Sequence, residues 1–316
     1  MDSLESIIFD DGEFQAGMAR KTLAYLSSRQ TTGYTTGGLY YAFHRADDER
    51  GLVTIVHGFS EGMYKYRELI YIMLRLGYST LCYEHRGHGR SIRTTESGSA
   101  VHIDSFDIYV DDLDSVTLEV VRRFAGGCPC HLFAHSMGGC VAALYAETHS
   151  GEYSKLVLSS PMLGLRLNPV AGLLAPTAVH MLCLAGKGED TFPVFGKDEK
   201  FQNSPSTSLE RWQYFKSVRD GNVLLRQTNP TYGWIDSALR ASKKAVVDSP
   251  RIDIPCLLLM AQDDSLVDNS RSEAFAKGNR LVRPVMVAGT KHEIMSSPKS
   301  VLLEYYKLID GFLSEE

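Results

Sequence analysis

The sequence lacks any excess of positive charge. Its 316 residues include 33 Lys and Arg against 38 Asp and Glu, which gives a formal net charge of −5 at pH 7. Proteins that bind nucleic acids or anionic membranes by electrostatic attraction carry a basic patch or stripe. We therefore expect no nucleic-acid partner and, at most, loose and reversible contact with a membrane surface.

The sequence also lacks a hydrophobic run long enough to cross a membrane. Its longest apolar stretch covers residues 170–185 and is interrupted by Pro176 and His180. That stretch is shorter than the roughly 20 residues that a transmembrane helix requires. The first six residues, MDSLES, have neither a basic start nor an apolar core, so no secretory signal is expected. These features predict a cytoplasmic protein.

The six cysteines follow no pattern of a metal site or a disulfide framework. Cys128 and Cys130 are too close together for an ordinary zinc pair, and no second pair could complete such a site. Most of the others lie in or beside apolar runs, where a thiol behaves as a small hydrophobe. We expect free thiols in a reducing compartment, no metal and no cofactor.

What the sequence does have is an alternation of apolar β-rich runs and helical patterns. Several runs are almost continuously apolar, as strands buried on both faces of a parallel sheet should be. The predicted strands cover residues 39–44, 52–56, 79–83, 130–134, 155–159, 256–260 and 285–287. The alternation predicts an α/β fold with a mostly parallel central sheet and helices on both faces.

Two of the intervening segments, residues 64–76 and 106–124, have the apolar spacing of amphipathic helices. Four aspartates lie on the other face of the second segment. We interpret them as a solvated helix face, and a metal cluster is the less favoured alternative. These residues are Asp107, Asp111, Asp112 and Asp114.

The alternation breaks between residues 165 and 249. This stretch has early prolines, polar patches and no convincing strand, but it contains helical pieces at 208–218 and 232–247. We interpret residues 165–249 as a helical cap inserted over the carboxyl ends of the strands, where open α/β sheets bind ligands. Residues 1–164 and 250–316 then form the core.

A serine lies in a sharp turn between a predicted strand and a predicted helix. Residues 134–139 read AHSMGG, the pattern of a nucleophile elbow that is usually written G-x-S-x-G. The elbow needs small residues because the backbone crowds a strained nucleophile from both sides. Ala134, in place of the first glycine, is the smallest possible departure. Ser136 is therefore the candidate nucleophile.

A serine nucleophile needs a base that is itself oriented by an acid, in the chain order Ser, Asp or Glu, His. The predicted strand 256–260 is followed by two adjacent carboxylates, Asp263 and Asp264. Asp264 begins DSLV, which fits a D-x-x-V form, so it is the preferred acid and Asp263 is a turn residue. His292 follows the predicted strand 285–287 in the loop GTKHE and is the candidate base.

An oxyanion hole needs two main-chain donors. One is the N–H after the nucleophile, Met137, and the other comes from the loop after an early strand. The predicted strand 52–56 runs into HGF, so Phe59 is the expected second donor. Gly58 lets the backbone approach closely, and His57 is expected to brace the loop.

Together these motifs resemble a known family. The sequences HG at 57–58, EHRGHGRS at 84–91, AHSMGG at 134–139 and GTKHEI at 289–294, with Asp264, are similar to the serine aminopeptidase-like branch of the α/β-hydrolases. That branch contains monoacylglycerol lipases and bacterial lysophospholipases. Within it the chain most resembles the bacterial lysophospholipase L2 type over residues 35–315.

The resemblance implies an α/β-hydrolase fold and a role for each residue. Ser136 would be the nucleophile, Asp264 the acid and His292 the base, with Phe59 and Met137 as oxyanion donors. Glu84 stands where the family commonly has Asp, which should affect only the bracing of its loop.

The predicted cap is rich in apolar and aromatic side chains, which suit an acyl chain better than a charged or sugar substrate. The same side chains could instead only pack the cap onto the core. They are Val170, Leu173, Leu174, Val179, Met181, Leu182, Leu184, Phe192, Phe195, Trp212, Tyr214, Phe215, Tyr232 and Trp234. Trp234 and Tyr232 are the candidate substrate-binding residues.

We therefore expect a serine hydrolase that cleaves carboxylic esters of monoacyl lipids through an acyl-enzyme, of the lysophospholipase or monoacylglycerol lipase type. A short-chain carboxylesterase, a thioesterase or an aminopeptidase on the same triad is the alternative enzyme. A non-catalytic binding protein of this fold is the alternative from another class, but such proteins usually lack a member of the triad.

Overall fold

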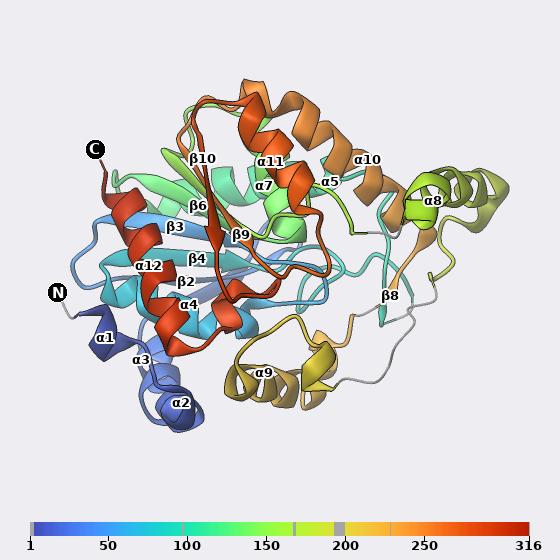
Figure 1. Cartoon of the computed structure of the whole chain (residues 1–316). Coiled ribbons are helices and arrows are strands. Elements are labelled where there is room, and N and C mark those ends of the chain that lie inside the picture. The colour runs from blue at the N-terminus through green and yellow to red at the C-terminus, as the bar shows by residue number, and fades with distance from the viewer. Residues whose placement is uncertain (1–2, 97, 167–168, 193–199, 228, 316) are drawn as a thin grey trace.

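An eight-stranded sheet runs through the centre of the molecule, and helices cover both of its faces (Figure 1). The computed structural model describes residues 3–96, 98–166, 169–192, 200–227 and 229–315, and of residues 169–173 only the backbone. The central strands are β1 (Gln30–Tyr34), β2 (Tyr40–His44), β3 (Gly51–Val56), β4 (Tyr78–Tyr83), β6 (Cys130–His135), β7 (Lys155–Ser159), β9 (Cys256–Ala261) and β10 (Val282–Val287).

The strand order in this sheet is β1-β2-β4-β3-β6-β7-β9-β10. Only the β1–β2 and β2–β4 pairs are antiparallel. All residues of β3, β4 and β9 are buried, because helices cover both faces. The predicted α/β fold with a mostly parallel sheet is confirmed. Since parallel strands end at one edge, the loops after β3, β4, β6, β9 and β10 meet there.

Each face of the sheet has its own hydrophobic cluster. Helices α1 to α4 and α12 contribute to one cluster, and α5, α7, α10 and α11 contribute to the other. The helices are α1 (Leu4–Ile7), α2 (Phe14–Gly17), α3 (Leu23–Ser27), α4 (Arg67–Arg75), α5 (Asp107–Val116), α6 (Arg122–Phe124), α7 (Met137–Thr148), α8 (Pro169–Leu182), α9 (Leu209–Asp220), α10 (Tyr232–Asp248), α11 (Asn269–Gly278) and α12 (Lys299–Ser314). No helix among the described residues is both long and apolar enough to cross a bilayer.

The segment between β7 and β9 contains α8, α9 and α10. Helix α8 lies at one end of the molecule, away from the sheet, whereas α10 returns along α7 (Figure 1). The buried side chains of α10, among them Trp234 and Ala238, belong to the same hydrophobic cluster as α7. This segment therefore joins the core through α10 and extends beyond it through α8.

Some elements differ from those expected. Strand β1 (QTTGY) was not predicted because it is a mostly exposed antiparallel edge strand without an apolar run. The short strand β8 (Asn229–Pro230) pairs with β5 (Ala100–Val101) inside the segment for which no strand was predicted. Strands of two residues are too short to show a hydrophobic pattern.

The expectation of a solvated face on α5 is wrong for Asp112. This carboxylate is buried and receives two hydrogen bonds from Arg86, Nε to Oδ2 at 2.6 Å and Nη2 to Oδ1 at 2.5 Å. The bidentate pair satisfies a charge that burial would otherwise penalise. It also fixes the 84–91 turn against α5.

Candidate active site

Ser136 lies in the strained turn between β6 and α7. Its backbone has φ +51° and ψ −120°, a left-handed conformation that is costly for a residue with a Cβ atom. The turn is held by two hydrogen bonds, from the Ser136 N–H to the Ser159 carbonyl at 3.2 Å and from the Met162 N–H to the Ser136 carbonyl at 2.8 Å. A Cβ atom at Gly138 would lie 2.3 Å from the Val56 carbonyl oxygen, so only glycine fits there.

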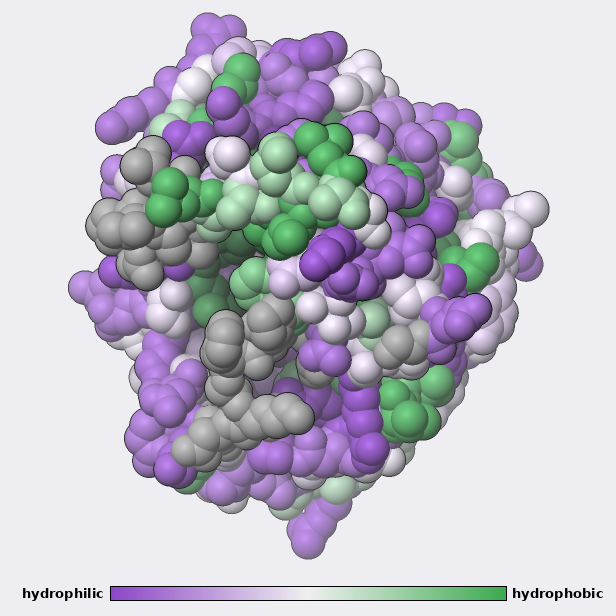
Figure 2. All heavy atoms as spheres, turned by 90° about the vertical axis from the view of Figure 1, so that its right-hand side faces the viewer, coloured by the Kyte–Doolittle hydropathy of each residue, from purple (hydrophilic) through white to green (hydrophobic). Residues whose placement is uncertain are grey.

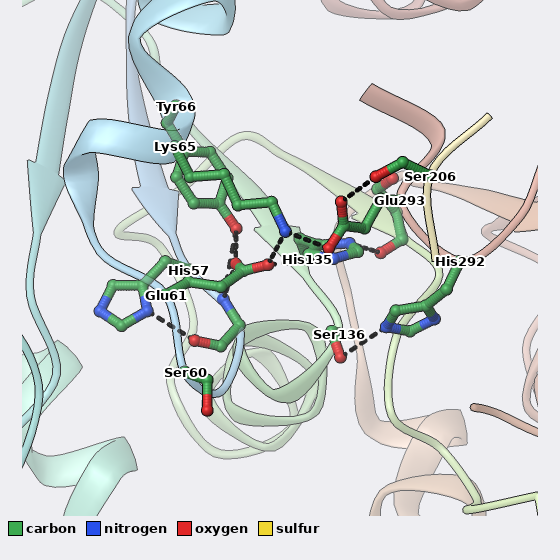
Figure 3. A network of polar contacts seen from close by, with 12 residues as sticks. His57, Ser60, Glu61, Lys65, Tyr66, His135, Ser136, Ser206, His292 and Glu293 are labelled. Carbon is green, nitrogen blue, oxygen red and sulfur yellow. Dashed lines mark hydrogen bonds and ion pairs between the residues drawn. The ribbon is translucent and has the colours of Figure 1, made fainter. Parts of the chain in front are cut away.

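The structure brings Ser136, His292 and Asp264 into one chain of hydrogen bonds. The Ser136 Oγ lies 2.9 Å from the His292 Nε2, and the His292 Nδ1 lies 2.8 Å from the Asp264 Oδ2. Because the carboxylate accepts from Nδ1, the neutral imidazole keeps Nε2 free to accept the serine proton. Figure 3 shows the histidine side chain pointing at the serine.

The surroundings of Asp264 keep it ionised. The N–H groups of Leu266 and Val267 donate to its other oxygen at 2.8 and 3.0 Å. Burial alone would raise the pKa of Asp264, but the hydrogen bond and charge of His292 and the two N–H donors outweigh it and hold the pKa below its ordinary value. The neighbouring Asp263 is exposed and contributes its N–H to a turn with Thr290.

The loop after β3 brings Phe59 close to the serine. A Cβ atom at Gly58 would lie 3.2 Å from the Ser136 Cβ, so the backbone of this loop packs directly against the candidate nucleophile. No hydrogen bond within the described part of the chain uses the N–H of Phe59 or of Met137. Both N–H groups are therefore available to an oxyanion.

Two neutral histidines hold carbonyl oxygens beside Phe59. His57 Nε2 accepts a hydrogen bond from the His85 N–H at 2.9 Å, so the proton of its ring lies on Nδ1, which donates to the Gly58 carbonyl at 2.7 Å. The His85 Nε2 donates to the His57 carbonyl at 3.1 Å. Burial lowers the pKa of His57 to about 4 and the pKa of His85 well below its ordinary value, so both rings stay neutral at pH 7.

A third histidine holds the other side of the loop. The Ser60 N–H donates to the His88 Nε2 at 3.3 Å, and the His88 Nδ1 donates to the Arg86 carbonyl at 3.2 Å. Burial lowers the pKa of His88 to about 3. In the same turn the Glu84 Oε2 accepts from the Arg90 N–H at 2.6 Å. These contacts fix the backbone on both sides of Phe59 and leave its N–H uncommitted.

The two candidate substrate-binding residues lie in different places. Trp234 is buried against the loop after β3, with its ring centroid 4.4 Å from that of Phe59. Tyr232 packs against Phe192 instead, and no contact within the described residues joins it to Ser136 or Phe59. Of the apolar residues predicted in this segment, Phe195 and the side chains of Val170 and Leu173 lie outside the described part of the chain.

The fold and this arrangement match one family of known proteins. The family described as "Serine aminopeptidase, S33" matches residues 47–299 of the chain. The chain belongs to this family. "Probable lysophospholipase L2" of Haemophilus influenzae is 31% identical over 271 residues, which cover 84% of each chain. "Lysophospholipase L2" of Escherichia coli K12 is 27% identical over 282 residues, 85% of this chain and 82% of that relative.

Two solved structures show the same fold. A soluble variant of monoglyceride lipase from Saccharomyces cerevisiae, in complex with a substrate analog, superposes with a TM-score of 0.72 at 19% identity, over 90% of this chain and 95% of that one. A thermostable carboxyl esterase from Bacillus coagulans superposes with a TM-score of 0.73 at 18% identity, over 90% and 97%. The predicted α/β-hydrolase fold and the predicted enzyme class, a serine ester hydrolase, are confirmed.

Sequence reasoning missed a group of buried charges beside this site. Glu61, Lys65 and Glu293 form a chain of ion pairs behind Ser136 and His292 (Figure 3). The spacing of Glu61 and Lys65, four residues apart, was the one available signal for a pair. Nothing local linked either residue to Glu293, which lies 228 positions after Lys65.

Proposed function

We propose that Ser136, His292 and Asp264 form a catalytic triad that hydrolyses carboxylic esters of monoacyl lipids through an acyl-enzyme. The observation that carries this proposal is the chain of hydrogen bonds from the Ser136 Oγ through His292 to Asp264, at 2.9 and 2.8 Å. It lies at the carboxyl edge of the sheet and at the start of α7, where N–H groups point toward a developing negative charge.

The chemistry proceeds in two steps. His292 Nε2 takes the proton of Ser136 as the Oγ attacks the ester carbonyl, and the N–H groups of Phe59 and Met137 stabilise the resulting oxyanion. His292 then donates this proton to the leaving alcohol oxygen, and the C–O bond breaks to give the acyl-enzyme. In the second step water gives a proton to His292 and attacks the acyl carbonyl. His292 then returns a proton to the Ser136 Oγ as the acyl C–Oγ bond breaks, which releases the fatty acid and restores Ser136.

The names of the relatives and the apolar surfaces near the site support a lipid substrate. The relatives named above are lysophospholipases, and the human relative, 29% identical over 221 residues, is named "Monoglyceride lipase". The Trp234 ring packs against the ring of Phe59, in the loop that lies against the candidate nucleophile. The side chains of Leu174, Met181 and Leu184 are 58–69% exposed, on the side of the molecule where Figure 2 shows hydrophobic surface around a hollow.

We infer that residues 165–249 act as a cap on this site and that residues 1–164 and 250–316 act as the core. Leu165 forms a β-bridge with Val267 beside the acid loop, and the Glu293 N–H donates to the Pro205 carbonyl at 2.9 Å, so the segment adjoins the loops of both Asp264 and His292. The exposed apolar side chains of the cap support loose, reversible contact with a membrane surface. The six free cysteines favour a cytoplasmic location.

Purified wild type and Ser136→Ala should be compared on a panel of substrates. It contains a long-chain monoacylglycerol, lysophosphatidylcholine, p-nitrophenyl esters of increasing chain length, an acyl thioester and an aminoacyl p-nitroanilide. We expect kcat/KM to rise with acyl length and to favour the monoacyl lipid esters, and Ser136→Ala to lose about a million-fold in kcat. A preference for the shortest esters, the thioester or the anilide would replace the lipid assignment with one of these substrates.

A further inference from the structure

Behind the candidate site, one buried ammonium lies between two buried carboxylates. The Lys65 Nζ is 2.5 Å from the Glu61 Oε1 and 2.5 Å from the Glu293 Oε1, and the Lys65 side chain is only 3% exposed (Figure 3). Burial of such charges is costly unless each is paired and hydrogen-bonded. Three buried charged side chains lie together beside the candidate nucleophile, so we asked what function they could have.

The first carboxylate belongs to the oxyanion loop. The Glu61 Oε2 accepts the Gly58 N–H at 2.8 Å and the Tyr66 hydroxyl at 2.6 Å. The Gly58 N–H belongs to the His57–Gly58 peptide, which precedes the Gly58–Phe59 peptide whose N–H we propose as an oxyanion donor. Glu61 therefore anchors the loop one peptide before this donor, and the His57 Nδ1 holds the Gly58 carbonyl of the donor's own peptide.

The second carboxylate belongs to the loop of the base. Glu293 follows His292 in the chain, and its Oε2 accepts the Ser206 hydroxyl at 2.7 Å. Its N–H donates to the Pro205 carbonyl at 2.9 Å, and the Lys291 Nζ donates to the Ser204 carbonyl at 3.1 Å. The loop of His292 is thus bound on one side to the cap segment and on the other to Lys65.

The three groups stay charged because each stabilises the next. Burial would raise the pKa values of Glu61 and Glu293. The Lys65 ammonium, helped by His135 and the Tyr66 hydroxyl at Glu61 and by the Ser206 hydroxyl at Glu293, outweighs burial and holds both pKa values below their ordinary values. Burial would likewise lower the pKa of Lys65, but Glu293 and Glu61 raise it above its ordinary value. Without the ammonium, two carboxylates would repel each other in a water-poor space.

We propose that Lys65 is a positioning residue that ties the oxyanion loop to the loop of His292, so that the donor at Phe59 and the base keep a fixed relation to Ser136. The inference rests on the proposed function of Ser136 and His292. Lys65 touches neither of them in the described contacts; it acts through Glu61 and Glu293. The ion pairs of Lys65 position the reacting groups and do not form an acyl-binding surface. Loss of these ion pairs should therefore lower kcat more than it raises KM.

The chain contains a matched control for a purely structural role. Arg211 on α9 is also 3% exposed and also lies between two carboxylates, Glu68 at 2.7 Å and Asp11 at 2.7 Å. It joins α9 to α4 and to the N-terminal region, and among the described residues neither carboxylate forms a hydrogen bond or ion pair with the oxyanion loop or the His292 loop. Arg211→Met therefore removes a comparable buried cation without loosening the site.

The test compares Lys65→Met, Arg211→Met and wild type for Tm, for kcat and KM on a p-nitrophenyl ester, and for the rate of labelling by a long-chain fluorophosphonate. We expect both variants to lose thermal stability. For Lys65→Met we expect kcat and the labelling rate to fall by about a hundredfold, with little change in KM. Arg211→Met should keep both rates near those of wild type.

Glu293→Gln is the second variant, because it keeps the size of the side chain, removes the charge that pairs with Lys65 and leaves an amide that can still bond the Ser206 hydroxyl. If Lys65→Met does not fold, a kcat of Glu293→Gln equal to that of wild type would overturn the proposal. An equal loss of kcat in Lys65→Met and Arg211→Met, or a wild-type kcat in folded Lys65→Met, would do the same. Failure of the proposed function looks different: wild type itself would then not react with the probe.

Discussion

The Asp264 carboxylate makes three hydrogen bonds with the described residues, two with backbone N–H groups and one with the His292 Nδ1. An asparagine in its place would keep the volume but could present an NH₂ group to Nδ1, which stabilises the wrong tautomer of the base. The adjacent Asp263 is exposed and makes no contact with His292 in the described part of the chain. A substitution of Asp264 can therefore be compared with the same substitution of Asp263 as its control.

We predict that Asp264→Asn lowers kcat by about 10⁴-fold with little change in stability. Asp263→Asn should keep kcat within about twofold of wild type, since exposed substitutions away from a site have small effects. Steady-state kinetics on one ester, with Tm as the measure of folding, decide the matter. Equal activity of the two variants would contradict the assignment of Asp264.

At the scale of elements, apolar strands were predictable and polar ones were not. The buried strands β3, β4, β6, β7 and β9 are short, mostly apolar runs, and their length and β-branched or aromatic residues favour strands over helices. By contrast β1 is polar, and α1 has only four residues, too few to show a helical period. The elbow was predictable because its small residues are required locally, whereas the Lys65 tie depends on a contact between distant loops.

One carboxyl group is buried where α7 packs against α10, in surroundings that disfavour its charged form. Glu147 is 4% exposed, and neither of its oxygens has a hydrogen-bond partner in the described residues. Burial raises its pKa to about 8. The folded protein therefore holds a proton that the unfolded chain releases above its ordinary pKa, and stability falls as pH rises from about 4.5 to about 8.

We predict that Glu147→Gln removes the fall in stability that wild type shows as the pH rises. The free energy of unfolding of the variant, relative to wild type, should increase by about 2 kcal/mol between pH 5 and pH 8.5. Urea unfolding at both pH values measures the change, and Glu304→Gln, an exposed position on α12, serves as the control. If the free energies of unfolding of wild type and Glu147→Gln change with pH in the same way, the prediction is wrong, because ionisation of Glu147 then does not destabilise the fold.

At the scale of the whole molecule, buried neutral histidines connect stability to pH. Burial lowers the pKa values of His44, His57, His88, His131 and His135 to about 3–4, and that of His85 also falls well below its ordinary value. The unfolded chain binds protons on these rings below about pH 6.5 while the folded protein does not. The contribution of these histidines to the free energy of unfolding is therefore complete above pH 6.5 and is lost progressively as the pH falls toward 4.

We predict that the free energy of unfolding falls steeply below pH 6.5, with uptake of several protons on unfolding at pH 5. His44→Gln should reduce that uptake by about one proton, because burial is the only cause of its lowered pKa. His44 lies in β2 and makes no contact with Ser136 in the described residues, so activity at pH 7.5 should be kept. If the free energy of unfolding were the same at pH 7 and pH 5, the buried histidine rings would not be neutral in the folded protein, contrary to our assignment.

The most direct test of the whole account is to trap the acyl-enzyme. Wild type is mixed with a long-chain monoacyl ester, quenched in acid within milliseconds, and analysed by intact-protein and peptide mass spectrometry. The account predicts one acyl group per chain, on the peptide that contains Ser136, and none in Ser136→Ala. Turnover of the ester by Ser136→Ala, or an acyl group on another residue in wild type, would contradict it.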